Sequence, residues 1–289
     1  PRLRKTDFRS CNFSAVETSK VANLQLGGAA VPKIHAEQGF GDLIQFSRYA
    51  PMVLSKGAEV ILEVPKPLVT VMQTLHPEVS IAVQGEPLPE FDFHCPVMSL
   101  PYVFKTTVET VPSSDRYLSS DPAKVALWQE KLGATSAKRV GLVWSGSATH
   151  KNDHNRSIAL SDLLPLLDTP CEWHSLQKEY REGDLAVLED IPQLRQHQDD
   201  LIDFSDTAAL IECLDLVITV DTSVAHLAGA LGKPVWILVP RMPCYRWLLD
   251  RTDTPWYPSA QLFRQSEAGD WRDVLTEVED ALRSDAGPV

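Results

Sequence analysis

The segment from Leu214 to Pro240 constrains the fold of this chain more than any other. Its apolar, β-branched run at Leu216–Val220 is typical of a buried parallel strand, and a second such run follows at Val235–Val239. The stretch between them, Val224–Leu231, favours a helix and is followed by a Gly and a Pro. The segment therefore predicts a strand–helix–strand unit of the kind that builds parallel α/β sheets.

Three polar residues, Asp221, Thr222 and Ser223, lie where the first of these strands ends and the helix begins. Their side-chain oxygens can cap the helix. The free N–H groups of its first turn and the positive end of its dipole favour a phosphate. His226 is expected on the first turn, close to any group bound there. The same residues are equally compatible with an ordinary capped crossover helix that binds nothing.

The composition excludes several classes of partner. The chain has 289 residues and a net charge of −12, whereas nucleic acid and anionic membranes need a broad basic surface. No apolar run reaches membrane-spanning length and no signal peptide is visible, so we expect no integral membrane segment and a cytoplasmic location. The five cysteines form no CxxC pair, which predicts free thiols.

Strand and helix patterns alternate along most of the chain. In the first half, strands are predicted at 31–36, 60–64, 80–83 and 91–95, and helices at 42–55 and 68–75. In the second half, further strands are predicted at 139–144 and 172–176, and helices at 122–132, 160–167, 206–213 and 271–282. This order predicts an α/β protein with two Rossmann-like halves in tandem, whose parallel sheets face a central cleft lined by the loops that follow the strands.

A stretch rich in Ser and Pro at 112–121 breaks this rhythm and is the candidate linker. The sequence therefore predicts four parts: an N-terminal arm at 1–30, an N-terminal Rossmann-like domain with linker at 31–120, a C-terminal Rossmann-like domain at 121–265, and a C-terminal helix and tail at 266–289.

The loop after the first predicted strand carries two glycines and two carboxylates. Gly39 and Gly41 permit a tight turn and a close approach of the backbone to a ligand. Asp42 is expected at a helix start that faces the cleft, where its carboxylate could accept a proton from an attacking hydroxyl. Asp42 could instead be a helix N-cap, and Glu37 could serve as the base in its place.

The loop Trp144–Ser157, after the first strand of the second half, concentrates groups that can bind an anion. Its hydroxyls, glycine and cations could hold a phosphate: Ser145, Gly146, Ser147, Lys151 and Arg156. No Walker sequence is present. His150 and His154 are four residues apart, but no third ligand is evident, so we predict no metal site. The alternative is a solvated surface loop. This loop and the loop Asp221–His226 could bind one diphosphate from two sides.

Five segments share the patterns of a known family: EQGFGDLIQFSRYAP at 37–51, FDFHCPVMSLP at 91–101, GLVWSGS at 141–147, DFSDTAALIECLDLVITVDTSVAHLAGALGKPVW at 203–236, and PWYPSAQLFRQ at 255–265. On these segments the chain resembles glycosyltransferase family 9, the heptosyltransferase relatives among GT-B enzymes. It resembles more closely the glycosyltransferase-like domain that follows tetratricopeptide repeats in many bacterial proteins. No such repeat signature is visible in residues 1–30, which leaves open what acceptor the repeats would present.

The resemblance implies a GT-B fold, with the acceptor bound by the N-terminal half and a nucleotide-sugar donor by the C-terminal half. It implies an inverting glycosyltransferase that needs no metal or other cofactor, because a helix dipole and basic side chains stabilise the leaving diphosphate. Asp42 matches the position of the family's base. The acceptor-side loop around it comprises Glu37, Gln38, Gly39 and Gly41.

On the donor side, the resemblance assigns the phosphate element to Asp221, Thr222, Ser223 and His226. Arg156 is the counterpart of a basic donor-binding residue, although the spacing of its loop departs from the family pattern. Leu176 and Gln177 could line the pocket for the nucleotide base. The acceptor is an unknown glycan, lipid-linked molecule or protein.

Two other functions are compatible with the same residues. One is a nucleotide-sugar epimerase or hydrolase on the same scaffold, and the other is a non-catalytic GT-B-like binding or assembly module, because one fold hosts several chemistries.

Overall fold

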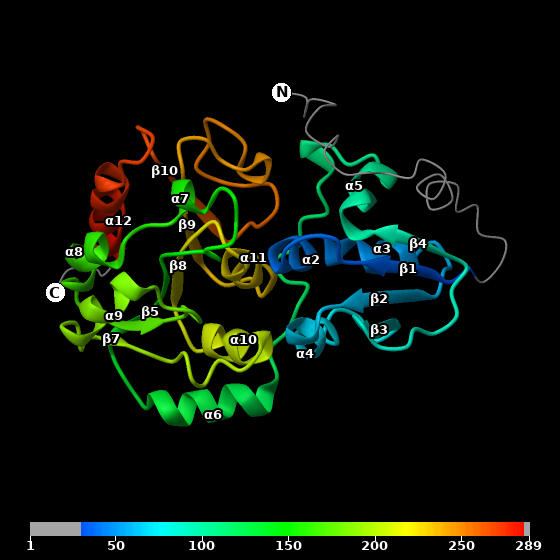
Figure 1. Ribbon diagram of the computed structural model, residues 1–289, viewed down its shortest axis with the longest axis horizontal. Coiled ribbons are helices and arrows are strands. Elements are labelled where there is room, and N and C mark those ends of the chain that lie inside the picture. The colour runs from blue at the N-terminus through cyan, green and yellow to red at the C-terminus, as the bar shows by residue number, and fades with distance from the viewer. Residues whose placement is uncertain (1–29, 286–289) are drawn as a thin grey trace.

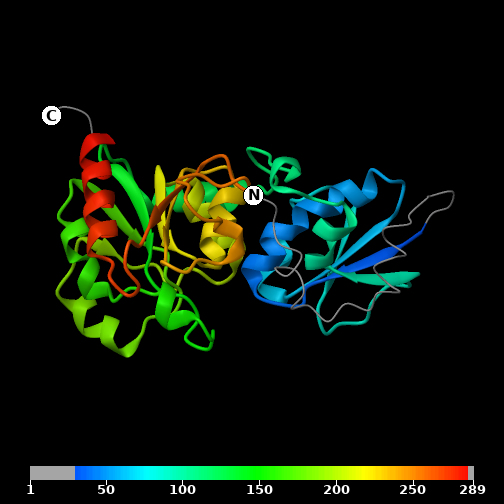
Figure 2. The ribbon, with the colours of Figure 1, turned by 90° about the horizontal axis from the view of Figure 1, so that it is seen from above.

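The structure, a computed structural model, describes residues 30–285 of the chain. Two parallel sheets, each packed against helices, form two halves that lie side by side (Figure 1 and Figure 2). The predicted arm at 1–30 lies outside the described residues except for its last residue, as does the end of the C-terminal tail. The domain boundaries stay a prediction.

The N-terminal half contains a four-stranded sheet in the order β3-β2-β1-β4. Its strands are β1 (Pro32–His35), β2 (Val60–Val64), β3 (Val79–Val83) and β4 (Phe93–Pro96). Its α-helices are α2 (Phe40–Phe46), α3 (Ala50–Leu54), α4 (Val69–Met72) and α5 (Leu100–Val103), with 3₁₀ turns at 47–49, 66–68, 97–99 and 108–110. In the register, Ile34 of β1 pairs with Leu62 on one side and Cys95 on the other.

The C-terminal half contains a six-stranded sheet in the order β10-β9-β8-β5-β6-β7, and every pairing in it is parallel. Its strands are β5 (Lys138–Val143), β6 (Cys171–Ser175), β7 (Leu194–Arg195), β8 (Leu216–Val220), β9 (Val235–Val239) and β10 (Ala260–Arg264). Its α-helices are α6 (Pro122–Leu132), α7 (Asp153–Arg156), α8 (Leu164–Leu167), α9 (Glu182–Glu189), α10 (Phe204–Glu212), α11 (Ser223–Ala230) and α12 (Arg272–Asp285), with 3₁₀ turns at 160–163 and 245–247.

These elements confirm the predicted α/β class, and the strands β2, β8 and β9 and the helix α6 begin and end where the sequence predicts. The predicted helix at 42–55 is instead divided into α2, a 3₁₀ turn and α3. Pro51 lies in the first turn of α3, and a proline has no N–H with which to continue the hydrogen bonds of a preceding helix. The sequence did not predict α9, β7 or β10. β7 has only two residues, and β10 is an edge strand with an exposed Gln261.

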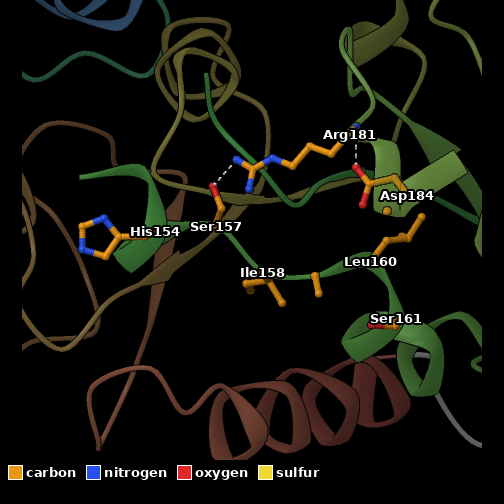
Figure 3. A pocket seen from close by; sticks show the side chains of 9 residues that line it. His154, Ser157, Ile158, Leu160, Ser161, Arg181 and Asp184 are labelled. Carbon is orange, nitrogen blue, oxygen red and sulfur yellow. Dashed lines mark hydrogen bonds between the residues drawn. The ribbon is translucent and has the colours of Figure 1, made fainter. Parts of the chain in front are cut away.

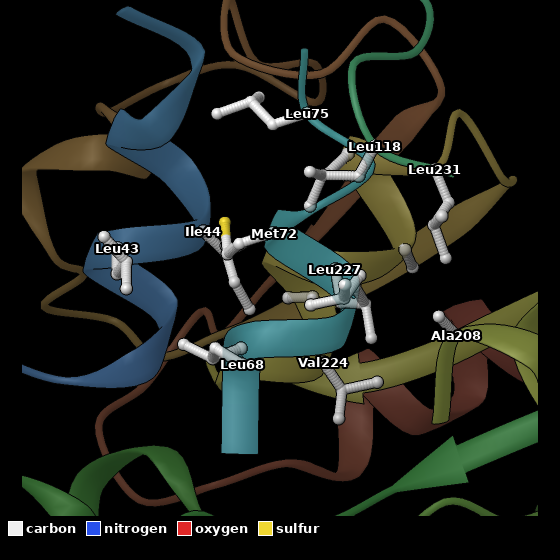
Figure 4. Packing of buried hydrophobic residues seen from close by; sticks show 14 of the residues in the cluster. Leu43, Ile44, Leu68, Met72, Leu75, Leu118, Ala208, Val224, Leu227 and Leu231 are labelled. Carbon is white, nitrogen blue, oxygen red and sulfur yellow. The ribbon is translucent and has the colours of Figure 1, made fainter. Parts of the chain in front are cut away.

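The two halves share one hydrophobic core. Leu43 and Ile44 of α2 belong to the same buried cluster as Val224 and Leu227 of α11. Figure 4 shows residues of this cluster arriving from both halves, with Leu68 and others of the N-terminal half beside them. A second cluster lies between the C-terminal sheet and its outer helices, α12 among them. None of the helices within residues 30–285 is long and apolar enough to cross a membrane.

Candidate functional site

The strand order of the C-terminal sheet indicates where a ligand would bind. Counted from β5 as strand 1, the order is that of a doubly wound sheet, 3-2-1-4-5-6, and the order reverses between β5 and β8. Ligands of such sheets bind outside the carboxyl ends of the strands at this reversal. The loops that follow β5 and β8 are the two that the sequence predicts to hold a diphosphate. The topology therefore brings both loops to the expected place.

The loop after β8 forms the start of α11. Thr222 is the N-cap residue, and its hydroxyl accepts a hydrogen bond from the backbone N–H of Val224 at 3.3 Å. A second hydroxyl, that of Thr219, lies 3.1 Å from the Thr222 hydroxyl and holds it in place. Ser223 is the first helical residue, so its backbone N–H is one of those that a helix leaves free for an anion.

Asp221 precedes this cap and is tied to the other loop. Its backbone carbonyl accepts a hydrogen bond from Arg156 at 2.8 Å. Burial raises the pKa of the Asp221 carboxyl, while the Trp247 indole and the charge of Arg156 act in the opposite direction. Arg156 thus joins the two predicted phosphate loops.

The loop after β5 is held by hydrogen bonds at its two ends and is exposed in its middle. Ser145 is buried, and Gln177 both accepts a hydrogen bond from its N–H at 3.3 Å and donates to its carbonyl at 3.0 Å. The N–H of Gly146 donates to the Ser157 hydroxyl at 3.1 Å. Between these anchors, Ser147 and Lys151 are exposed.

Gly146 is required by the position of Arg156. A Cβ atom at residue 146 would overlap with the Arg156 guanidinium, so only a glycine lets the cation lie across the loop. Asp153, which is buried, pairs with both Arg156 and Arg181. The sequence predicted no role for Asp153 or Arg181, which lie 28 positions apart and meet only because Arg181 precedes α9, a helix that the pattern did not reveal.

A cavity of about 380 Å³ lies beside this arginine pair, in the C-terminal half. Its wall contains apolar residues and several polar side chains: His154, Ser157, Ile158, Ala159, Leu160, Ser161, Arg181, Gly183 and Asp184. Arg181 and Ser157 face each other at its edge (Figure 3). His154 therefore lines a cavity, and no group of three His, Cys, Asp or Glu residues within the described part of the chain could hold a metal ion.

The acceptor-side loop follows β1, which lies at the reversal of strand order in the N-terminal sheet. Gly39 is the N-cap of α2, and the carboxylate of Asp42 accepts a hydrogen bond from the Gly39 N–H at 3.0 Å. Asp42 therefore supports the cap from the third helical position and is not itself the cap. Glu37 and Gln38 are exposed in the same loop, and desolvation raises the pKa of Glu37.

The first turns of α2 and α11 touch each other. A Cβ atom at Gly41 would lie 2.7 Å from Cδ2 of His226 and 3.4 Å from Cα of Ser223. Side chains at this position would separate the two helices, so Gly41 is needed for a close approach and not for its backbone freedom. The contact brings Asp42, the predicted base, next to Ser223, the start of the predicted phosphate element.

His226 is buried in this contact. Its Nδ1 lies 2.8 Å from the hydroxyl of Tyr257, and its ring stacks on Trp247 with centroids 5.4 Å apart. Burial, helped by the charge of Arg48, lowers the pKa of His226 to about 3, so the ring is neutral at pH 7. His226 thus packs between the halves on the fourth helical position, and its ring is not free at the helix start.

Two further arginines complete the site, and the sequence assigned neither a role. Arg246, in the connection from β9 to β10, forms an ion pair with Asp42 and donates to Oε1 of Gln45 at 2.5 Å. Arg48 is buried and donates to the Trp256 carbonyl at 2.7 Å. Arg48 lies within the segment that carries the family resemblance, but its Trp256 partner is 208 positions away in sequence, where no local pattern could indicate it.

Comparisons with known proteins agree with this geometry. A model of glycosyltransferase family 9 (heptosyltransferase) matches residues 201–238, which include α10, β8 and α11. Protein FlbA of Caulobacter vibrioides is 28% identical over 276 residues, which cover 86% of this chain and 46% of FlbA. The chain thus spans about half the length of this curated relative.

Two solved structures share the fold. ADP-heptose LPS heptosyltransferase II of E. coli superposes with a TM-score of 0.58 at 13% identity, covering 89% of this chain and 99% of that chain. TibC of enterotoxigenic E. coli, an iron-containing dodecameric glycosyltransferase, superposes with a TM-score of 0.56 at 12% identity, covering 85% of this chain and 66% of its own.

Proposed function

We propose that this glycosyltransferase domain, of the family 9 type and with the GT-B fold, transfers a sugar from a nucleotide-sugar donor to an acceptor hydroxyl, with inversion and without a metal ion. The observation that supports it most is the contact between the first turns of α2 and α11. This contact joins a carboxylate that can act as a base to a helix start that can hold a diphosphate.

The chemistry follows from these positions. The diphosphate lies at the free N–H groups of α11, between Ser223 and the guanidinium of Arg156. Asp42 accepts the proton of the acceptor hydroxyl, whose oxygen forms a bond to the anomeric carbon from the face opposite the diphosphate. The bond between that carbon and the diphosphate oxygen breaks, and the diphosphate leaves with the electron pair. Attack from the opposite face inverts the anomeric centre.

The other predicted donor residues have supporting roles in this scheme. Ser145, Gly146 and Gln177 form the rigid floor of the loop, and Ser147 and Lys151 are exposed where they can fold over a bound nucleotide. Glu37, Gln38 and Gly39 flank Asp42 on the acceptor side. His226 holds the two helices together from within. The acceptor stays unassigned, and the cytoplasmic location stays a prediction.

The first test is a thermal-shift screen with ADP, UDP, GDP, CMP and dTDP, with and without magnesium. ADP is the first choice because heptosyltransferase II is an ADP-heptose enzyme. A ligand at a hundred times its Kd adds ~2.7 kcal/mol to the free energy of unfolding, which raises Tm by several degrees. A shift that does not depend on magnesium supports the proposed donor site. No shift with any nucleotide, in a folded sample, contradicts it.

The second test concerns the base. Asp42→Asn keeps an oxygen for the Gly39 N–H but cannot accept a proton, so we expect sugar transfer to be lost while nucleotide binding is retained. Turnover at the wild-type rate in this variant would remove Asp42 from the mechanism, and Glu37→Gln would then be the variant to measure.

A non-catalytic binding module is the second candidate, and one observation favours it. Asp42 is held by Arg246 in an ion pair, and a paired carboxylate is a poor base. Nucleotide binding without transfer to any acceptor, in wild type and Asp42→Asn alike, would support the module. Release of free sugar from the donor in the absence of an acceptor would support a hydrolase instead.

A further inference from the structure

Arg246 contacts the proposed catalytic base from the opposite half of the molecule. Its Nη2 pairs with Oδ1 of Asp42, its Nε donates to Oε1 of Gln45 at 2.5 Å, and its Nη1 lies 2.7 Å from Sγ of Cys244. The residue is buried, although it comes from a connection without regular helix or strand on either side of its short 3₁₀ turn. All three of its guanidinium nitrogens therefore have partners within the protein.

Two indirect contacts link this guanidinium to α11, whose start is the proposed diphosphate position. Asp42 belongs to the turn of α2 that touches Ser223 at the start of α11. The residue after Arg246, Trp247, stacks on His226 of that helix. A planar guanidinium can pair with a carboxylate or with two phosphate oxygens, and the phosphate carries the larger charge. A diphosphate at α11 therefore competes with Asp42 for Arg246.

We propose that Arg246 is a switch that controls the base Asp42, and that binding of the donor operates this switch. Without donor, Arg246 holds Asp42 in an ion pair. When the donor binds, its diphosphate takes over the guanidinium, and Asp42 is left free to accept the acceptor proton. This inference rests on the proposed function, and it adds a positioning residue and an order of binding, with the donor before the acceptor.

The switch has a physical consequence for the base. A cation beside a carboxylate stabilises its charged form, which makes it a weaker proton acceptor. Departure of Arg246 removes that stabilisation at the moment when the leaving group is in place. An acceptor that arrives before the donor meets a base that is already occupied.

The test is a double-mutant cycle on nucleotide affinity, measured by calorimetry with ADP and UDP as the probes. In Asp42→Asn the guanidinium loses its charged partner, so we expect nucleotide to bind on the order of tenfold more tightly than to wild type. In Arg246→Met we expect binding on the order of tenfold weaker. In the double variant, the effect of Asp42→Asn should disappear, because Arg246 is the group that transmits it.

A merely structural ion pair gives a different result. In that case Asp42→Asn leaves nucleotide affinity unchanged, or changes it equally with and without Arg246, and either result overturns the switch. Arg251→Met is the matched control, because Arg251 lies in the same connection and pairs only locally with Asp253 in the contacts described, so its affinity should equal that of wild type. Should Arg246→Met not fold, Arg246→Lys serves in the cycle, because it keeps the positive charge but loses the planar group that pairs with two oxygens at once.

A pH profile separates the switch from a general loss of structure. Arg246→Met takes a cation away from the Asp42 carboxylate in the free protein, so the acid limb of kcat/KM for the donor should move to higher pH. The acid limb of kcat should stay in place, because the donor complex has already released Asp42. Equal movement of both limbs overturns the switch, whereas absence of any nucleotide binding by wild type overturns the proposed function itself.

Discussion

Two clusters of charged and aromatic side chains, each built around a buried histidine, differ in where they lie along the strands. The junction cluster consists of Asp42, Gln45, Arg48, His226, Arg246 and Tyr257 and lies between the halves. The sheet-edge cluster consists of Arg139, Glu172, His174, Arg195 and His197 and lies across β5, β6 and β7. Each contains a buried histidine with a strongly lowered pKa, and each pairs carboxylates with arginines.

The sheet-edge cluster joins neighbouring strands. Glu172 pairs with Arg195 at 2.9 Å and lies 3.2 Å from Nε2 of His174, whose Nδ1 is 3.0 Å from Nε2 of His197. Arg139 and Glu172 are the second residues of β5 and β6, so this cluster begins at the amino ends of the strands. Trp128 of α6 packs edge-on against His197 and covers it.

The junction cluster instead follows the carboxyl ends of strands. Asp42 comes after β1, His226 after β8 and Arg246 after β9. Parallel α/β sheets bind ligands at that end, where helix starts and loops meet. The comparison teaches that a buried charge or a shifted pKa does not by itself identify a functional site. The end of the strands at which it lies is the more informative property.

The largest expected difference between the clusters concerns their arginines. Arg48→Met leaves the Trp256 carbonyl and the Tyr117 hydroxyl without the donor that now lies at 2.7 and 3.1 Å, and we expect the free energy of unfolding to fall by about 3 kcal/mol or more. Arg195→Met should cost less than about 1 kcal/mol, because that side chain is 49% exposed and Arg139 still faces Glu172. Urea denaturation measures both. Equal losses in the two variants would mean that the junction is no more dependent on its buried cation than the sheet edge is.

An intermediate effect is expected from a single methyl group between the halves. In Gly41→Ala the new Cβ meets the His226 ring at 2.7 Å, and we expect destabilisation of about 1–3 kcal/mol together with weaker nucleotide binding. Gly183→Ala is the matched control, since Gly183 is also the second residue of its helix and has open space around it. That change should be neutral or stabilise the protein by up to about 1 kcal/mol. Similar melting temperatures for the two variants would show that α2 and α11 can move apart at little cost in stability.

The smallest effect at neutral pH concerns the buried histidines. The pKa is lowered from 6.5 to about 4 for His197 and to about 3 for His226, so the unfolded chain takes up protons first as the pH falls. Stability is therefore full above pH 6.5 and declines as the pH falls from 6.5 towards 4 at His197 and towards 3 at His226.

Replacing either ring by Phe should flatten this decline, which chemical denaturation at pH 7, 5.5 and 4.5 would measure. Only His226→Phe is expected to disturb nucleotide binding as well, because His226 belongs to α11, whose start is the proposed diphosphate position, whereas His197 packs against Trp128 of α6. Weaker nucleotide binding in His197→Phe would contradict the distinction between the clusters.

Much of the fold could be predicted from the sequence, because its signals are local. The strands β8 and β9 are uninterrupted apolar runs, and Thr222 is among the capping residues that the sequence places before α11. The missed elements have weak local signals: β7 is two residues long, and α9 follows exposed, charged loop residues. The positions of the three candidate loops were predictable for the same reason, since each directly follows a predicted strand.

The partners within the site were not predictable in this way. By itself the sequence determined the alternation of strands and helices, and it determined which loops carry Asp42, Arg156 and Thr222, because backbone preference and periodicity act over a few residues. Only the tertiary structure decided that Arg246 meets Asp42, 204 positions away in sequence, and that Gly41 lies under His226. Such pairs depend on how two separately wound sheets pack against each other, and packing geometry leaves no periodic trace in a single sequence.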